Sequence, residues 1–130
     1  ALDLVEARLK ERLTSREERL TEISSYLVDS GGKRVRPLVT LMMFRACGGT
    51  GLDDIVDVAA ALELIHSATL LHDDIIDESE QRRGKPSAYH RYGLANTLVT
   101  GDFVFSKAFQ LCARFEERLI NWAAEACIML

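Results

Sequence analysis

Proline, cysteine and aromatic residues are scarce in this chain of 130 residues, and basic residues do not outnumber acidic ones. The 2 prolines leave long stretches free to form helices. The 3 cysteines are far apart and form no CxxC motif, which argues against a disulfide framework or a zinc site. With 16 Lys and Arg against 20 Asp and Glu, the net charge of −4 disfavours a general nucleic-acid binder.

Apolar runs of membrane-spanning length are also missing, because polar residues interrupt the longest of them. The first 20 residues are charged and do not show the pattern of a signal peptide. Together with the cysteine usage, these absences predict a cytoplasmic protein without a transmembrane segment. The sequence stops inside an apolar helical pattern, at Ile128-Met129-Leu130. We therefore expect residues 1–130 to be the N-terminal part of a single larger domain.

Leu, Ala, Glu and Arg dominate the rest, and these residues favour helices. Apolar residues make up 48% and charged residues 28%, which is typical of a globular chain. Apolar positions recur at helical spacing throughout, so the sequence predicts an all-α bundle of six helical pieces. These pieces are expected at residues 1–13, from Ser15 to about 28, at 37–47, 53–77, 93–114 and 115–130.

Capping and glycine patterns set some of the expected boundaries. Ser15 and Glu18 have the spacing of a capping box, and Gly31 with Gly32 should end the helix that it opens. Residues 81–87 are predicted to form a loop. The piece at 53–77 is apolar nearly all round, which predicts a central, buried helix.

That buried helix carries a narrow polar stripe. With Asp73 as the origin and about 100° per residue, His66, Thr69, Asp77 and Glu63 all fall within about 80° of it. Buried charges need partners or metals, so the stripe should face a polar cavity. Asp73 and Asp77 lie one turn apart, and two such carboxylates with phosphate oxygens and water suit Mg²⁺.

The same acidic pattern occurs a second time, so the spacing alone is weak. Asp53, Asp54 and Asp57 repeat it at the start of the helix, where acids cap the helix and complement its dipole. We interpret that copy as structural. Asp73 and Asp77 lie near the C-terminus, where acids oppose the dipole, so something that binds them is expected.

Two basic clusters flank the acidic stripe in the sequence. One contains Lys33, Arg34 and Arg36, and the other reads RRGKPS at residues 82–87. Each alone is usually a solvated charge run. Arginine forks nevertheless bind phosphate in a bidentate manner, and lysine adds point charge. A Mg²⁺-binding pair of acids beside two basic clusters therefore predicts a site that binds two diphosphates.

Three ordered segments carry a family resemblance. They read GGKRVRP at 31–37, ELIHSATLLHDDIID at 63–77 and RRGKPS at 82–87, and GDF at 101–103 follows them. Together they resemble the trans-polyprenyl diphosphate synthases over nearly the whole chain. The resemblance implies an all-α isoprenoid-synthase fold around a central cavity, which this chain would form only in part. It also implies condensation of an allylic diphosphate, such as farnesyl diphosphate, with isopentenyl diphosphate.

The resemblance assigns roles to individual residues. Asp73 and Asp77 would hold Mg²⁺ that bridges the allylic diphosphate, with Asp74 part of the same metal motif. Arg82 would contact the allylic diphosphate. The isopentenyl diphosphate would be held by Lys33, Arg36, His66 and Arg83. The stripe agrees for His66, Asp73 and Asp77 and places Asp74 on its flank.

Product length is also open to prediction from the resemblance. The family uses bulky residues four and five positions before the first aspartate as a floor for the growing chain. Here Thr69 and Ala68 occupy those positions, and both are small. A small floor predicts a long-chain synthase, such as an octaprenyl diphosphate synthase. The resemblance further implies a homodimer of the full-length protein.

Three other functions compete with this interpretation. The family carries a second Asp-rich motif on a later helix, which this sequence lacks, so the 130 residues alone are expected to be inactive. A non-catalytic, truncated or partner subunit of a prenyl synthase is the first alternative. A terpene cyclase also uses an Asp-rich helix, but the two basic clusters favour two diphosphate substrates. The third alternative is a plain helical interaction bundle, in which added metal ions would have no effect.

Overall fold

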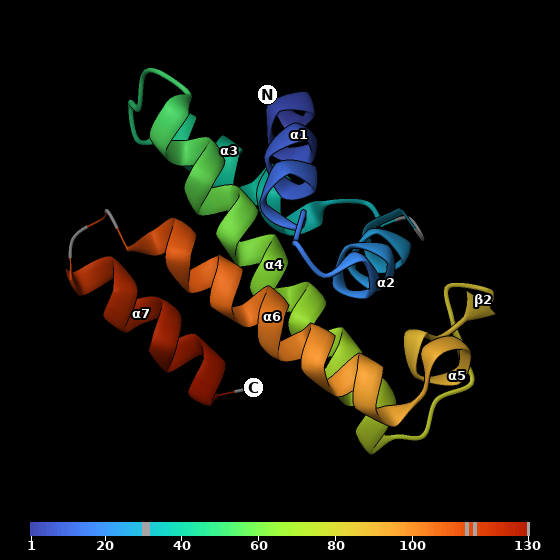
Figure 1. Ribbon diagram of the computed structural model, residues 1–130. Coiled ribbons are helices and arrows are strands. Elements are labelled where there is room, and N and C mark those ends of the chain that lie inside the picture. Colours follow the sequence, from blue (N-terminus) through green and yellow to red (C-terminus); the bar gives the residue numbers. More distant parts are fainter. Residues whose placement is uncertain (30–31, 114, 116, 130) are drawn as a thin grey trace.

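The computed structural model describes residues 1–29, 32–113, 115 and 117–129, and within them the chain is an all-α bundle with one small hairpin (Figure 1). The elements are α1 (Leu2–Arg12), α2 (Glu18–Asp29), α3 (Val35–Ala46), α4 (Asp53–Ile76), β1 (Gln81–Arg82), β2 (Lys85–Pro86), α5 (Ala88–Tyr92), α6 (Leu94–Cys112) and α7 (Glu117–Ile128). The all-α prediction is therefore confirmed.

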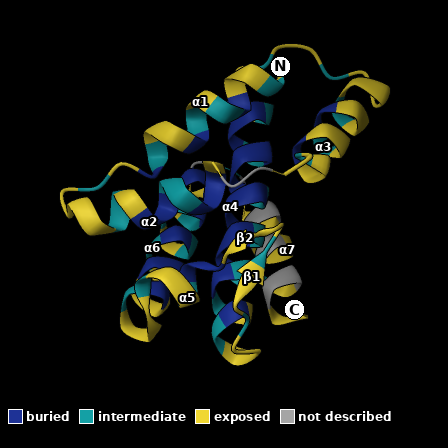
Figure 2. Ribbon diagram, turned by 90° about the vertical axis from the view of Figure 1, so that its right-hand side faces the viewer, coloured by how far each residue is buried: buried dark blue, intermediate teal, exposed yellow. Residues whose placement is uncertain are grey.

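Helix α4 forms the centre of the bundle, as its apolar sequence predicted. It contacts α1, α3, α5 and α6, and half of its 24 residues are buried (Figure 2). Three consecutive alanines, Ala59, Ala60 and Ala61, are at most 1% exposed, and their small side chains let neighbouring helices approach closely. The core therefore follows α4 along its whole length.

Helix α6 packs along α4 and closes the other side of the core (Figure 1). The two helices approach closely where Gly101 meets His72, because a Cβ at Gly101 would lie only 2.2 Å from His72 Nε2. A glycine is therefore needed at this crossing. His72 Nε2 also lies 3.3 Å from the carbonyl oxygen of Leu98, so this side chain contributes to the packing of α4 against α6.

The sequence missed the β1–β2 hairpin, the short helix α5 and one helix boundary. Residues 81–86, expected as part of a loop, form the hairpin, and α5 is a separate short helix before α6. The capping box is also wrong: Ser15 Oγ accepts a hydrogen bond from the Glu17 backbone N–H, and Thr21 Oγ1 accepts one from that of Ser15. Local pairing of Thr21 with Ser15 delays α2 until Glu18. Gly31, predicted to help end α2, lies outside the described residues, as do Arg114 and Leu130.

The apolar character of α4 has a second possible interpretation. Of the helices in the described ranges, it alone is long and apolar enough to cross a membrane, with a mean hydropathy of 1.4. However, 61% of that stretch is buried inside the bundle. Core helices pass the same test, so the burial accounts for the composition of α4 without a membrane.

Candidate functional site

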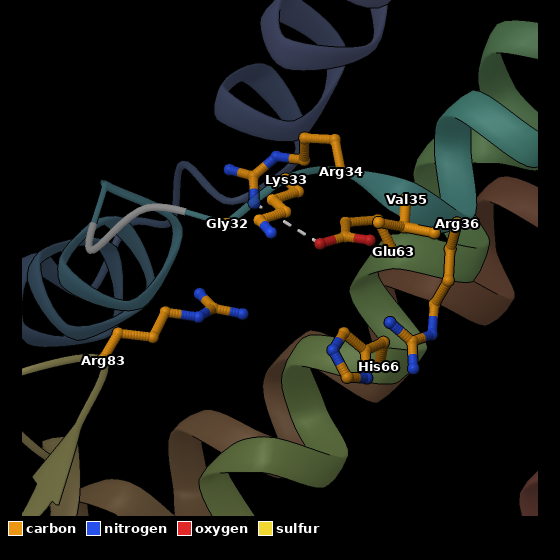
Figure 3. Close-up of a pocket in the computed structure, with 8 residues that line it drawn as sticks. All are labelled: Gly32, Lys33, Arg34, Val35, Arg36, Glu63, His66 and Arg83. Atoms are coloured by element: carbon orange, nitrogen blue, oxygen red, sulfur yellow. Dashed lines mark hydrogen bonds and ion pairs between the residues drawn. The ribbon is translucent and has the colours of Figure 1, made fainter.

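Four residues predicted to hold a diphosphate meet around one cavity of about 520 Å³ (Figure 3). We call Lys33, Arg36, His66 and Arg83 the basic cradle. The cavity is lined by these residues together with Gly32, Arg34, Val35 and Glu63. Its volume suits a small ligand, and its charge suits an anion.

Three separate parts of the fold supply the basic cradle. Lys33 and Arg36 come from the segment that enters α3, and His66 comes from the middle of α4. Arg83 extends toward the cavity from the hairpin turn, on the side opposite Arg36 (Figure 3). The distances along the sequence do not predict that residues 33, 66 and 83 meet, although each lies in a motif that the sequence singles out.

The hairpin explains why two adjacent arginines point to different sites. Arg83 and Gly84 form its two-residue turn, and both have positive φ, at 54° and 78°. This is the backbone of a type I′ turn, which suits a tight hairpin. Arg82 lies in β1, and its side chain contacts Asp74 of α4. Arg83 lies at the tip of the hairpin, and its side chain lines the cavity of the basic cradle. The hairpin is itself held, because the Tyr26 hydroxyl donates to the carbonyl oxygen of Pro86 at 2.5 Å.

His66 is neutral over the physiological range in this setting. Burial lowers its pKa to about 4, and the charges of Arg36, Arg83 and Arg82 contribute to that lowering, whereas Asp73 acts in the opposite direction. A neutral imidazole still offers one N–H donor. His66 therefore offers the cavity an N–H donor rather than a resident positive charge.

Arg34 and Glu63 form a buried pair at the edge of the cavity. Arg34 Nη1 lies 3.4 Å from Glu63 Oε1, and the two side chains are 12% and 6% exposed. Burial raises the pKa of Glu63, although Arg34, Arg36 and Arg83 lower it. The sequence placed Glu63 on the polar stripe without a role and did not single out Arg34 from its cluster. Only the fold brings them together, 29 residues apart.

The three acids at the other end of α4 have different environments. Asp73 and Asp77 are exposed, and we call this pair the acidic end. Asp74 is fully buried and accepts hydrogen bonds from Arg82 Nε at 3.1 and 3.0 Å and from Arg82 Nη2 at 2.7 Å. The hydrogen bond to Asp74 is the main cause that raises the pKa of Arg82.

This geometry bears on two sequence expectations. The stripe was expected to face a polar cavity: His66 and Thr69 line cavities, whereas the acidic end is exposed to solvent in this part of the domain. Asp74 was expected to belong to the metal motif with Asp73 and Asp77; both its carboxylate oxygens accept hydrogen bonds from Arg82 in this structure, and its role toward a metal stays a prediction. Within the described residues, no three His, Cys, Asp or Glu side chains are grouped to hold a metal ion. The carboxylates that suit Mg²⁺ without breaking an ion pair are those of the acidic end, which phosphate oxygens and water would have to complete.

A second, more apolar cavity adjoins the basic cradle. It has a volume of about 400 Å³ and shares Val35, Arg36 and His66 with the first. Thr69, one of the two predicted floor residues, lines it. Ala68, the other, is fully buried in the helical core instead. The structure thus separates the two floor positions.

Sequence and structure comparisons place the chain in a family. Residues 17–130 match the model of the polyprenyl synthetase family, so the chain belongs to it, as the three motifs had indicated. The octaprenyl diphosphate synthase of Escherichia coli (strain K12) is 43% identical over 107 residues, which are 82% of this chain and 33% of that protein. The chain thus spans about a third of the length of this relative.

Solved structures agree with the family. A decaprenyl diphosphate synthase from Rhodobacter capsulatus superposes with a TM-score of 0.93 at 39% identity, over 98% of this chain and 39% of that one. A polyprenyl synthase from Caulobacter crescentus, complexed with calcium and isoprenyl diphosphate, gives 0.89 at 37% identity, over 95% and 38%. The isoprenoid-synthase fold expected from the sequence is therefore confirmed for this part of the domain.

Proposed function

We propose that the protein to which this chain belongs is a Mg²⁺-dependent prenyltransferase that condenses an allylic diphosphate with isopentenyl diphosphate. One observation carries the proposal: α4 joins the basic cradle to the acidic end. His66 and Asp73 are seven residues apart, about 10 Å along the helix. That spacing suits two diphosphates held side by side, one by cations and the other by Mg²⁺.

The proposed roles follow from the two environments. Lys33, Arg36, His66 and Arg83 bind the isopentenyl diphosphate. The allylic diphosphate is held through the acidic end and by Arg82. Bound Mg²⁺ supplies Lewis-acid stabilisation of the charge that grows on the departing diphosphate.

The chain's own residues contribute positioning and charge to the reaction. The allylic C–O bond breaks, and the electron pair leaves with the diphosphate, whose charge Arg82 helps to stabilise. The isopentenyl double bond then attacks the allylic cation to form the new C–C bond, and the tertiary cation that results loses a proton to the released diphosphate, which restores a double bond. Apolar walls, such as those of the smaller cavity, shield the cation from water. No side-chain nucleophile is needed.

Product length is the finer part of the proposal. Thr69 lines the apolar cavity and is small, which favours a long product, as in an octaprenyl diphosphate synthase. Thr69→Phe should therefore shorten the product. Ala68→Phe should instead disturb the packed core, because Ala68 has no exposed surface. Chromatography of the products, beside a thermal melt of each variant, separates these effects. An unchanged product from a folded Thr69→Phe variant would contradict the floor assignment.

The test of the proposed function uses the complete protein encoded by the gene. Farnesyl diphosphate and radiolabelled isopentenyl diphosphate should give a longer prenyl diphosphate with Mg²⁺ and none after chelation by EDTA. Binding of isopentenyl diphosphate without turnover would indicate the alternative, a non-catalytic partner subunit. Absence of both would contradict the proposal. We also propose a cytoplasmic homodimer, which fractionation and light scattering test directly.

A further inference from the structure

Arg34 lies between two members of the basic cradle in the sequence and lines the same cavity, but its guanidinium is engaged by other residues of the chain. Its guanidinium pairs with Glu6 of α1 through Nε and with Glu63 of α4 through Nη1. Nη2 also donates to the carbonyl oxygen of Val28 at 3.0 Å. With 12% of its side chain exposed and three partners, Arg34 is engaged as a structural clamp.

The backbone at Arg34 shows what the clamp holds. Arg34 is the N-cap of α3 and has φ 52° and ψ 41°, the left-handed conformation that non-glycine residues adopt at a cost. Its carbonyl oxygen accepts a hydrogen bond from the Leu38 N–H at 3.0 Å and so begins the helix. The backbone conformation of Arg34 therefore sets the directions in which the side chains of Lys33 and Arg36 point.

Gly32 lies close to the side chains of both Arg34 and Arg83, which come from opposite sides of the cavity. A Cβ at Gly32 would lie 3.0 Å from Arg34 Nη1 and 3.2 Å from Arg83 Nη1. The guanidinium groups of Arg34 and Arg83 thus approach the same point of the backbone. Any shift of Arg34 would move the surface against which Arg83 rests.

Glu6 comes from a helix that the family match, which begins at residue 17, does not include. Helix α1 docks on the bundle through buried Val5 and Leu9 and through a second ion pair, between Arg8 and the buried Asp57 of α4. Arg8 and Asp57 do not line the basic cradle. Helix α1 therefore makes two ion pairs with the rest of the described chain. The pair of Glu6 with Arg34 includes a residue that lines the cavity, whereas the pair of Arg8 with Asp57 does not.

We propose that Glu6 is a positioning residue for diphosphate binding: through Arg34 it fixes the turn that presents Lys33 and Arg36. The inference rests on the proposed function, because it names a determinant of the same site. Helix α1 thus acts as part of the binding machinery, although it contributes no residue to the cavity lining.

Electrostatics alone predicts the opposite effect of losing Glu6. Its carboxylate lies beside a site rich in positive charge, so its removal would raise the positive potential and strengthen anion binding. Loss of position weakens binding, because Lys33 and Arg36 no longer converge. The direction of the change therefore distinguishes the two roles.

The experiment measures binding of isopentenyl diphosphate to the complete protein by isothermal titration calorimetry. Glu6→Gln should weaken binding on the order of tenfold, the scale typical for loss of a group that orients ligand-binding residues. Arg34→Lys should do the same, because lysine keeps the charge but cannot hold two carboxylates as a fork. Asp3→Asn, at an exposed position of the same helix, is the charge-matched control and should bind as the wild type does.

Arg8→Gln separates positioning from simple docking of α1. It should lower the melting temperature, because it breaks the pair with Asp57. Binding of isopentenyl diphosphate should stay within about twofold of wild type, whereas loss of an orienting group weakens binding on the order of tenfold. An equal loss of affinity in Arg8→Gln and Glu6→Gln would overturn the specific role of Glu6. Unchanged or tighter binding by Glu6→Gln would also overturn it. Failure of the wild type to bind would contradict the proposed function instead.

Discussion

Helix α4 carries the pattern Asp-Asp-x-x-Asp at both ends, and the two copies are engaged differently. In the first copy Asp57 is buried and paired with Arg8 of α1. In the second copy the buried acid is Asp74, paired with Arg82 of the hairpin. Each copy therefore pairs one carboxylate with an arginine and leaves acids exposed, but the buried position within the pattern differs.

The helix dipole separates the exposed acids of the two copies. Asp53 lies in the first turn, where the partial positive charge of the helix N-terminus stabilises a carboxylate. Asp73 lies in the last turn, where the dipole opposes it. The first copy thus stabilises the helix, whereas the second has an electrostatic cost that a bound cation would offset. Position on the helix therefore distinguishes the two copies electrostatically, although both have the same pattern of acids.

The largest expected contrast between the two copies is in turnover. Asp73→Asn in the complete protein should lower kcat by about 10²–10³-fold, because it removes a carboxylate from the group that stabilises the departing diphosphate. Asp53→Asn changes the matching residue of the first copy and should leave kcat near the wild-type value. Steady-state assays at saturating Mg²⁺ make the comparison. Equal losses in both variants would remove the functional distinction.

The buried acids should have similar effects on stability but different effects on activity. Asp57→Asn and Asp74→Asn should each lower the free energy of unfolding by about 1.5–3 kcal/mol, the range for hydrogen bonds to charged groups. The partner arginines are 30% and 25% exposed, so water partly compensates each of them. Urea titrations measure these changes.

Only Asp74→Asn should also affect catalysis, because Arg82 then loses the carboxylate that orients it. We expect kcat to fall by roughly tenfold, with little change in the KM for isopentenyl diphosphate. If Asp74 were instead a metal ligand, the apparent affinity for Mg²⁺ would fall sharply. A Mg²⁺ titration of the Asp74→Asn variant distinguishes the two roles.

His66, between the two copies, should make stability depend on pH. Its pKa is about 4 in the folded chain, against the ordinary value of 6.5. Between these values the unfolded chain binds more protons at this position, so its contribution to stability falls as the pH falls from 6.5 toward 4. Urea unfolding at pH 7 and pH 4.5 should show a larger loss for the wild type than for His66→Gln. Parallel losses would contradict the lowered pKa.

The sequence predicted the features that periodicity and motifs encode. The central helix expected at 53–77 is almost correct, since α4 spans Asp53–Ile76. Every member of the basic cradle also lies in one of the three segments that carry the family resemblance, and the structure brings these residues around one cavity; their role in binding diphosphate stays a prediction. The helix and the segments can be found from the sequence because a long apolar pattern and a charged motif are both local signals.

The features that the sequence does not predict depend on contacts between distant residues. The pairing of Asp74 with Arg82 needs the β1–β2 hairpin, whose turn begins with Arg83 rather than the usual Asn or Asp. The clamp of Arg34 by Glu6 spans 28 residues and has no spacing rule. The family resemblance does not tell whether Asp74 is a metal ligand or the partner of an arginine, because the sequence motif is identical in both cases.

The smallest expected contrast concerns stability at the exposed acids. Asp53→Asn should lower the free energy of unfolding by about 0.3–1 kcal/mol, and Asp73→Asn should raise it by a similar amount, since the dipole favours the first carboxylate and opposes the second. Arg82 attracts Asp73 and so reduces the gain, but its guanidinium is already held by Asp74. Both effects should shrink in 1 M salt, where the Debye length is about 3 Å. Opposite signs in metal-free urea titrations, combined with the loss of turnover in Asp73→Asn, would show that the second copy is kept for binding at the expense of helix stability. The same sign in both variants would mean that neighbouring charges, rather than the helix dipole, distinguish the two copies.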